Sequence, residues 1–539
     1  MLGEGLELFD NTAIYGGAIY LLIECQMSIT AFHAYNNSAT VQGGLLMASG
    51  LVEVYMQYGR IEGHKASYGA VIDASTEGVL IHIMDSTILN NKAMRDGGVV
   101  RISDLAVVYM ENVSMSENSA EFGGVVVAAT ATALFKSCQV FDNYASDSGG
   151  AFHCSYANIT FVKSTFEENA AAEYGGVISI ESTSILYVVD CALHHNFAGE
   201  SGGVAFLSDD SNARFVKSSC TSNGVIALGG VIYAEKRGLF DFVECIFEGN
   251  YANSAAVIYA TTDSDIAVSS SLFHDNHATS VTDGGAMHFV KIHSLLVEEC
   301  VFSNSTGGFG AAIQVDQLGN GALPQRRTSV VIDGALDSVT PLADEFDENE
   351  RRHLTDSTYR VKIYGTIFAH NSFEYNSVDF KLEDVCGGEV NGGAVYFRDL
   401  PSIALVTNST FRGNVACYGA GLYSSSSKVA VRDSVFDSNM ALHGGGGIFW
   451  KVISLNEETV TMENVVDLNN VAPYGPLVAT NMCKLQVQQH GLESSGTKFQ
   501  NPVKIHMQVC ISGTRHHIYA IVDTHIYHII GLLRTNGGQ

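Results

Sequence analysis

The 539-residue chain has little of several residue types on which common folds and functions depend. It contains 6 prolines and 1 tryptophan, and its 29 basic residues face 57 acidic ones, which gives a formal net charge of −28. Such an acidic balance excludes a nucleic acid or an anionic membrane surface as the expected partner. No apolar run reaches the ~18 residues that a membrane-spanning segment needs, so none is expected.

The 11 cysteines are dispersed and form no C-x-x-C pair. Several of them occupy one equivalent slot, which Ser164 and Ser271 fill in intervening stretches of the chain, and these cysteines are Cys138, Cys191, Cys245 and Cys300. A slot shared by thiols and hydroxyls predicts a small inward-facing column in the core. Disulfides are expected for a minority only, with Cys220 and a neighbouring repeat as the candidate pair. Cysteine usage therefore does not fix the compartment.

A glycine pair is abundant where proline is scarce, and it returns along nearly the whole chain. It recurs every 26 or 27 residues, and an asparagine precedes it by five or six positions, as in ENSAEFGGVV at 117–126 and ENAAAEYGGVI at 168–178. A fixed period in the twenties is typical of stacked structural repeats and not of one globular domain.

Each repeat carries two short stretches in which apolar and polar residues alternate, rich in Val, Ile, Phe and Tyr. Examples are ITFVKSTFEEN at 159–169 and FDFVECIFEGN at 240–250. This is strand chemistry, and no segment has a capped 3.6-residue stripe. A propeller blade needs a longer repeat and a leucine-rich repeat needs a different frame. The pattern therefore predicts an all-β fold, a right-handed parallel β-helix solenoid of about 16 coils.

The recurring residues have structural roles in such a solenoid. Asparagines stacked at one corner can form a ladder of amide hydrogen bonds. The predicted ladder consists of Asn118, Asn143, Asn169, Asn196, Asn223 and Asn250. Glycine supplies positive φ or close backbone approach at a corner. The predicted turn glycines include Gly123, Gly124, Gly149, Gly150, Gly175, Gly176, Gly202 and Gly203. An internal aromatic stack is predicted from phenylalanines three positions before the asparagine, namely Phe166, Phe247, Phe273, Phe411 and Phe436.

Two motifs of the repeat carry a family resemblance. FEEN at 166–169 and FEGN at 247–250 follow an F-x-x-N pattern, and GGAI at 16–19 and GGAF at 149–152 follow a G-G-A-apolar pattern. Together they resemble the repeats of chlamydial polymorphic outer membrane proteins and, more broadly, right-handed parallel β-helix proteins of the pectin-lyase-like superfamily. The resemblance implies architecture more than activity, because the shared residues build corners.

The repeat pattern divides the chain into a β-helix over 1–482 and a C-terminal segment over 483–539, read as the start of a small β domain followed by a divergent tail. Loop insertions interrupt the repeat at 318–357 and 372–391. The chain opens inside a coil, without a signal peptide or the cap that a β-helix end requires. We therefore expect it to be part of a longer chain whose N-terminus lies upstream.

An enzyme of the pectin-lyase-like fold needs acidic and basic residues clustered on adjacent coils. The candidate groups are Asp190 with His194 and His195; Asp209 and Asp210 with Arg214; and Asp241 with Glu244. None recurs as a stripe at the repeat spacing, so no catalytic residue, metal or cofactor is predicted.

The expected function is that of a non-catalytic extracellular or cell-surface solenoid with a structural or adhesion role. Glycans or surface proteins are its expected partners. The alternatives are a carbohydrate-active enzyme (a polysaccharide lyase, hydrolase or epimerase) and a calcium-dependent surface scaffold. A site where charged and aromatic side chains from adjacent coils converge would favour the enzyme.

Overall fold

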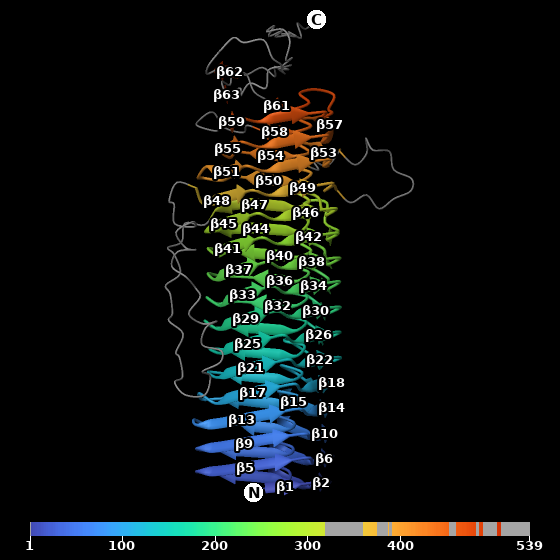
Figure 1. Ribbon diagram of the computed structural model, residues 1–539, viewed down its shortest axis with the longest axis vertical. Coiled ribbons are helices and arrows are strands. Elements are labelled where there is room, and N and C mark those ends of the chain that lie inside the picture. Colours follow the sequence, from blue (N-terminus) through green and yellow to red (C-terminus); the bar gives the residue numbers. More distant parts are fainter. Residues whose placement is uncertain are drawn as a thin grey trace, which may run out of the picture.

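The chain forms a parallel β-solenoid. The computed structural model describes residues 2–318, 359–373, 386, 391–451, 460–480, 485–488 and 504–507. It has about 15 turns at a spacing of about 27 residues, close to the 16 coils predicted from the repeat. Figure 1 shows the strands stacked one coil above the next along a rod. No helix with the length and apolarity of a membrane span occurs in the described ranges.

Each coil contributes one strand to each of several faces, and strands of successive coils pair in parallel in every sheet; only the pairings of β63, at the C-terminal end of the described residues, are antiparallel. We name the faces sheets A to D in the order in which the chain meets them. Sheet A has 18 strands. They are β1 (Leu2–Glu4), β5 (Cys25–Thr30), β9 (Val52–Gln57), β13 (Val79–Met84), β17 (Val107–Glu111), β21 (Thr132–Lys136), β25 (Asn158–Val162), β29 (Ile185–Val189), β33 (Asn212–Val216), β37 (Leu239–Val243), β41 (Asp265–Ser269), β45 (Ser294–Glu298), β48 (Val361–Tyr364), β51 (Ala404–Thr407), β55 (Val429–Arg432), β59 (Val460–Glu463), β62 (Leu485–Gln488) and β63 (Lys504–Met507).

Sheet B follows sheet A across a corner and has 16 strands. They are β2 (Glu7–Phe9), β6 (His33–Tyr35), β10 (Arg60–Glu62), β14 (Thr87–Leu89), β18 (Ser114–Ser116), β22 (Gln139–Phe141), β26 (Thr165–Glu167), β30 (Ala192–His194), β34 (Ser219–Thr221), β38 (Ile246–Glu248), β42 (Leu272–His274), β46 (Val301–Ser303), β49 (Ile367–Ala369), β52 (Thr410–Arg412), β56 (Val435–Asp437) and β60 (Val466–Leu468).

Sheet C lies after the ladder asparagine and consists of short strands in two groups, of 11 and 2. They are β3 (Thr12–Tyr15), β7 (Ser38–Gln42), β11 (Lys65–Tyr68), β15 (Lys92–Asp96), β19 (Ser119–Ala120), β23 (Tyr144–Ala145), β27 (Ala170–Ala171), β31 (Phe197–Ala198), β35 (Gly224–Val225), β39 (Tyr251–Ala252) and β43 (His277–Ala278), and then β53 (Val415–Tyr418) and β57 (Met440–Gly444).

Sheet D follows the glycine pair and has 16 strands. They are β4 (Ile19–Leu22), β8 (Leu46–Ser49), β12 (Ile72–Ala74), β16 (Val100–Ser103), β20 (Val126–Ala129), β24 (Phe152–Ser155), β28 (Ile178–Glu181), β32 (Ala205–Leu207), β36 (Ile232–Ala234), β40 (Ile258–Thr261), β44 (Met287–Ile292), β47 (Ile313–Leu318), β50 (Val395–Arg398), β54 (Leu422–Ser425), β58 (Ile448–Lys451) and β61 (Val478–Thr480).

The asparagine ladder runs along the corner between sheets B and C. Each ladder side chain donates from Nδ2 to the Oδ1 of the next asparagine, as from Asn118 to Asn143 at 3.0 Å and from Asn143 to Asn169 at 3.0 Å. The same Oδ1 accepts the backbone N–H of the preceding asparagine. All six predicted asparagines are buried, and the ladder runs unbroken from Asn91 to Asn276.

In two of the described coils another residue occupies the ladder position: His64 in one and Ser305 in the other. His64 accepts the backbone N–H of Asn37 at Nδ1 (3.1 Å) and donates from Nε2 to the Ala34 carbonyl (3.2 Å). The ring therefore supplies one acceptor and one donor, as the amide does, and burial lowers the pKa of His64 to about 4. The Ser305 side chain is too short to extend the ladder, and only its backbone N–H donates to Asn371 Oδ1, at 3.2 Å.

The two glycines of the pair meet different constraints, which Gly149 and Gly150 illustrate. Gly149 has φ +69°, the left-handed region in which a side chain is strained. A Cβ on Gly150 would lie 2.1 Å from the carbonyl oxygen of Gly176 in the next coil. Ala255 occupies the first position with φ +54°, so that position tolerates a small side chain.

The inner face of sheet B carries one register column of apolar side chains, which we call the inner column. Within it, six phenylalanines stack face to face at centroid separations of 4.3–5.3 Å. They are Phe247, Phe273, Phe302, Phe368, Phe411 and Phe436. Phe166 shares the column but not the stack, because Leu193 and Cys220 separate it from Phe247. Its ring packs instead against Phe161 at 4.7 Å.

Four of the cysteines form the predicted column in the core. The predicted disulfide of Cys220, by contrast, is wrong. Cys138, Cys191, Cys245 and Cys300 are buried free thiols. Hydroxyls in alternate coils accept the backbone N–H groups of these cysteines, as Ser164 does from Cys138 at 3.1 Å. Cys220 is also free, because it occupies a phenylalanine slot of the inner column and points into the core. The disulfide joins Cys386 to Cys417 instead.

The predicted insertions lie almost entirely outside the described residues. Between 318 and 357 only Leu318 is described, at the end of β47, and between 372 and 391 the described residues are 372, 373, 386 and 391. In the C-terminal segment, β63 pairs antiparallel with both β62 and β59 and so extends sheet A.

Candidate binding site on the outer face of sheet D

One outward-facing residue from each strand of sheet D lies in a single register column, which we call the outer column. Its neighbours pair across every coil interface, from Tyr20 at one end to Ala479 at the other. In order they are Tyr20, Met47, Asp73, Arg101, Val127, His153, Ser179, Phe206, Tyr233, Tyr259, His288, Gln314, Tyr396, Tyr423, Phe449 and Ala479. Aromatic residues are concentrated in its second half.

The aromatic members of the outer column stack on one another. Phe206 and Tyr233 have ring centroids 5.3 Å apart with planes 9° from parallel, and Tyr233 and Tyr259 follow at 5.6 Å and 3°. A second stack, of Tyr396, Tyr423 and Phe449, has separations of 5.1 and 5.3 Å. Since the ring faces contact each other, the ring edges and tyrosine hydroxyls face outward.

Aromatic residues just before the turn glycine form a wall beside the outer column. Tyr174 packs against Phe206 at 4.7 Å, and Phe309 packs against Tyr396 at 5.0 Å. Farther down the rod, the Arg101 guanidinium lies over the ring of Tyr68 at 4.6 Å. This wall explains how an outward-facing column comes to be largely buried.

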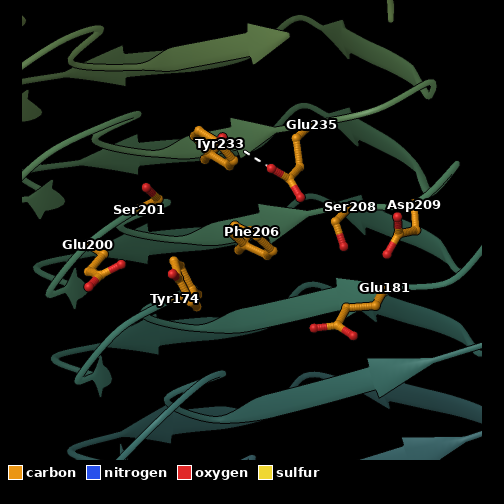
Figure 2. A pocket seen from close by; sticks show the side chains of 9 residues that line it. All are labelled: Tyr174, Glu181, Glu200, Ser201, Phe206, Ser208, Asp209, Tyr233 and Glu235. Atoms are coloured by element: carbon orange, nitrogen blue, oxygen red, sulfur yellow. Dashed lines mark hydrogen bonds between the residues drawn. The ribbon is translucent and has the colours of Figure 1, made fainter. Parts of the chain in front are cut away.

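A shallow pocket of about 430 Å³ opens where the wall and the first aromatic stack meet. Figure 2 shows Tyr174, Phe206 and Tyr233 at its centre, with carboxylates on both sides. Its lining residues come from three successive coils and are Tyr174, Glu181, Glu200, Ser201, Phe206, Ser208, Asp209, Tyr233 and Glu235. Aromatic and charged side chains from adjacent coils therefore converge here.

The pocket is rich in hydrogen-bond acceptors. The hydrogen bond to the Glu200 carboxylate is the main reason that the pKa of Tyr174 is raised to about 12. Tyr233 donates to Glu235 at 3.3 Å, and burial is the main cause of its raised pKa. Burial, followed by the charge of Asp209, raises the pKa of Glu181. The site therefore suits a ligand that donates hydrogen bonds, and it disfavours an anion.

A buried polar network continues the outer column beyond Tyr259. Ser254 Oγ lies 3.0 Å from His288 Nδ1, and His288 Nε2 lies 3.2 Å from Asp316 Oδ2. Gln314 and Arg398 donate to the same oxygen at 2.6 and 2.5 Å. The order hydroxyl, imidazole, carboxylate is that of a nucleophilic triad. However, Ser254 is 1% exposed and His288 4%, so the hydroxyl faces the protein interior and not a substrate.

The candidate groups identified in the sequence lie in different parts of the solenoid. Asp209 lies in the pocket, where Lys236 pairs with it at 2.6 Å, and Asp210 pairs with Arg237 at 3.0 Å. Arg214 and Asp241 pair at 3.1 Å on the outer face of sheet A.

The other weighed residues lie away from sheet D. Glu244 lies at the corner between sheets A and B, 3.9 Å from Lys217. His194 and His195 lie on the outside of sheet B, where Glu167 joins them. Asp190 occupies the left-handed corner before that strand, with φ 52°. The structure thus brings the two histidines together but gives them a partner that the sequence did not indicate.

Sequence reasoning missed the pocket, although a signal for it exists. The turn glycine is preceded by an aromatic residue in several coils, as in EYGGVI and EFGGVV. This signal could have located the wall. No protein-family model matches the chain, and no curated protein matches it, so the site rests on its own geometry.

Proposed function

We propose that this chain is a non-catalytic solenoid of the cell surface or extracellular space that binds neutral glycans along the outer column of sheet D. The observation that carries the proposal is the pocket around Tyr174, Phe206 and Tyr233, with carboxylates from adjacent coils. Carboxylates accept hydrogen bonds from sugar hydroxyls, and ring edges provide apolar contact beside them.

Charge and cysteine chemistry support the same proposal. A net charge of −28 disfavours polyanionic ligands over the length of the rod, but it does not oppose neutral ones. The Cys386–Cys417 disulfide is typical of an oxidising compartment. The remaining described thiols of the core are buried, and burial raises the pKa of Cys191 and Cys245 to about 12, which keeps them unreactive.

Binding of neutral oligosaccharides tests the proposal. Titration calorimetry of the full chain with gluco- and manno-oligosaccharides is expected to reveal binding that weakens about tenfold in Glu181→Gln or Glu235→Gln, because each loses an accepted hydrogen bond. Tyr144→Ala is the matched control, since Tyr144 is 47% exposed on sheet C, away from the pocket. Equal affinities for the pocket variants and the wild type would refute the proposal.

A carbohydrate-active enzyme is the second candidate, favoured by the same pocket, because aromatic and charged side chains from adjacent coils converge there. Incubation of the chain with alginate and pectin, with and without calcium, separates the two candidates. We expect no unsaturated products and no change in uronate epimer ratio, because the residues that line the pocket include no Lys or Arg to hold a uronate, and its carboxylates oppose an anion. Products that form with the wild type and disappear in Glu181→Gln would establish the enzyme instead.

A further inference from the structure

Glu167, His194 and His195 form a cluster on the outer face of sheet B, away from the proposed glycan site. Phe166 and Leu193 point into the core, so Glu167 and His194, which follow them, face outward. The two are register partners on adjacent coils, and their side chains therefore lie side by side.

Backbone conformation at the corner brings His195 to the same place. Residues that follow each other in a strand point to opposite faces, so His194 and His195 would normally diverge. His195, however, has φ 57°, because it occupies the left-handed corner before Asn196. This turn places the two imidazole rings 5.5 Å apart, at 85° to one another.

The three side chains bring their candidate ligand atoms within 4.8 Å of one another, with His194 in the middle. The Nδ1 atoms of His194 and His195 are 3.4 Å apart, and His194 Nδ1 is 3.5 Å from Glu167 Oε1. Two ligands at 2.0–2.1 Å from a tetrahedrally coordinated ion lie about 3.3–3.4 Å from each other. Both observed separations are close to that value and longer than a good hydrogen bond.

Other surface histidines of the described chain behave differently. His274 Nδ1 lies 2.9 Å from Ser303 Oγ, and His277 Nδ1 lies 3.0 Å from Thr306 Oγ1, ordinary hydrogen-bond distances. Only Glu167, His194 and His195 bring three candidate ligand atoms within 4.8 Å of one another among the described residues. The register neighbours of this cluster, Phe141 and Thr221, carry no positive charge that would oppose a cation.

We propose that Glu167, His194 and His195 bind a divalent transition-metal ion, with Zn²⁺ as the best match to two imidazoles and a carboxylate. This donor set suits zinc and disfavours calcium and magnesium, which prefer all-oxygen shells. Three protein ligands leave one tetrahedral position on the solvent side for water or an external donor. The proposal is independent of glycan binding on sheet D.

Calorimetric titration of the full chain with zinc sulfate at pH 7.5 tests the site. The wild type is expected to bind one equivalent of zinc more than the His195→Ala or Glu167→Gln variant does. If the stoichiometry is unchanged, the wild type is expected to bind zinc about tenfold more tightly than either variant. His277→Ala is the matched control, because His277 is also exposed and lies 3.6 Å from Asp275 without a third ligand. Co²⁺ should give visible absorption bands in the wild type and the control that are lost in the two site variants.

Acidification provides a second readout, because metal binding requires neutral imidazoles. Zinc affinity is expected to fall steeply below about pH 6, the range in which histidine protonates. Both site variants lie on the surface, so unchanged circular dichroism will verify their fold. Identical stoichiometry and affinity in the wild type and both variants, or absence of zinc binding to the wild type, would overturn the proposal.

Discussion

The inner column of sheet B and the outer column of sheet D both contain stacked aromatic rings, yet they differ in what surrounds them. The inner phenylalanines stack at 4.3–5.3 Å and the outer rings at 5.1–5.6 Å. Parallel strand pairing fixes both spacings. Inside, the rings lie among buried apolar side chains as far as Phe436, whose next register partner is Asp467. Outside, tyrosine hydroxyls, carboxylates and a histidine network lie beside the rings.

This difference explains why the inner column stays apolar from Leu8 to Phe436, whereas the outer one mixes charged, polar and aromatic residues. An inner side chain must fill a closed space against the rings above and below it, so six consecutive described coils retain phenylalanine. An outer side chain needs to match only its register neighbours and the wall. The outer column can therefore hold aspartate, arginine, histidine and tyrosine in turn without interrupting the solenoid.

Truncating one ring in each column is expected to give the largest difference. Phe302→Ala should lower the free energy of unfolding by about 3–5 kcal/mol, because it opens a cavity between Phe273 and Phe368. Tyr233→Ala should cost about 1 kcal/mol, since the outer column can relax toward solvent. Chemical denaturation of both variants measures this contrast, and equal losses would show that the outer stack is as tightly packed as the inner one.

His64, which replaces one asparagine of the ladder, is expected to make the stability of the solenoid sensitive to acid. Its pKa is about 4 in the folded chain and near 6.5 when exposed, so the unfolded state binds the proton first as the pH falls. Stability should therefore decrease from pH 6.5 to pH 4, by about 3 kcal/mol from this group. His64→Asn restores the amide and should remove this dependence. Parallel stability–pH curves for the variant and the wild type would contradict the assignment.

Asp73, which lies in the outer column, is expected to give the stability of the chain a pH dependence opposite in sign to that of His64. Burial raises its pKa from 3.8 to about 6, although Arg101 lies 3.5 Å away and favours the ionised form. As the pH rises, Asp73 therefore loses its proton at a higher pH in the folded state than in the unfolded state. Its contribution to the free energy of unfolding decreases by about 3 kcal/mol between about pH 4 and pH 6. Thermal melts of Asp73→Asn should therefore gain stability relative to the wild type as the pH rises. A constant difference between pH 4 and pH 7 would argue against the raised pKa.

A smaller effect is expected from breaking the ladder where it is continuous. Asn169→Leu removes the acceptor of the Asn143 amide and the donor to Asn196, and should cost about 1–3 kcal/mol. Lys163→Ala, at a solvent-facing corner of the same coil, should leave the midpoint of denaturation unchanged. Equal midpoints for the two variants would show that the ladder adds no stability.

Residues in fixed slots could be predicted from the sequence, and residues outside them could not. The repeat identified the solenoid, the ladder asparagines and the glycine pair, because each of these side chains meets the same surroundings in every coil. The stack was predicted less well: Phe166 was included although Leu193 and Cys220 isolate it, and Phe302 and Phe368 were left out. Cys386 lies in an insertion with no repeat register, so its pairing with Cys417 had no signal.

The candidate sites depended on geometry that spacing does not encode. Glu181 and Glu235 are 54 residues apart and become neighbours of one pocket only through the stacking of three coils. His195 meets His194 only because its backbone is left-handed, and residues in that corner slot vary from Glu168 to Ser222. Polar corner residues with no fixed identity leave no pattern to detect.

Pairing of each strand with its equivalent one coil later also determines how the rod would respond to force. The inter-coil hydrogen bonds lie along the long axis of Figure 1, so tension on an end coil opens them one after another and not all at once. Such unzipping requires little force per bond, and each coil of about 26 residues would release about 90 Å of extended chain. A tethered rod of this kind would lengthen in nearly equal steps, and the coil at Ser305, where the ladder is interrupted, would open at a lower force than its neighbours once unzipping reached it.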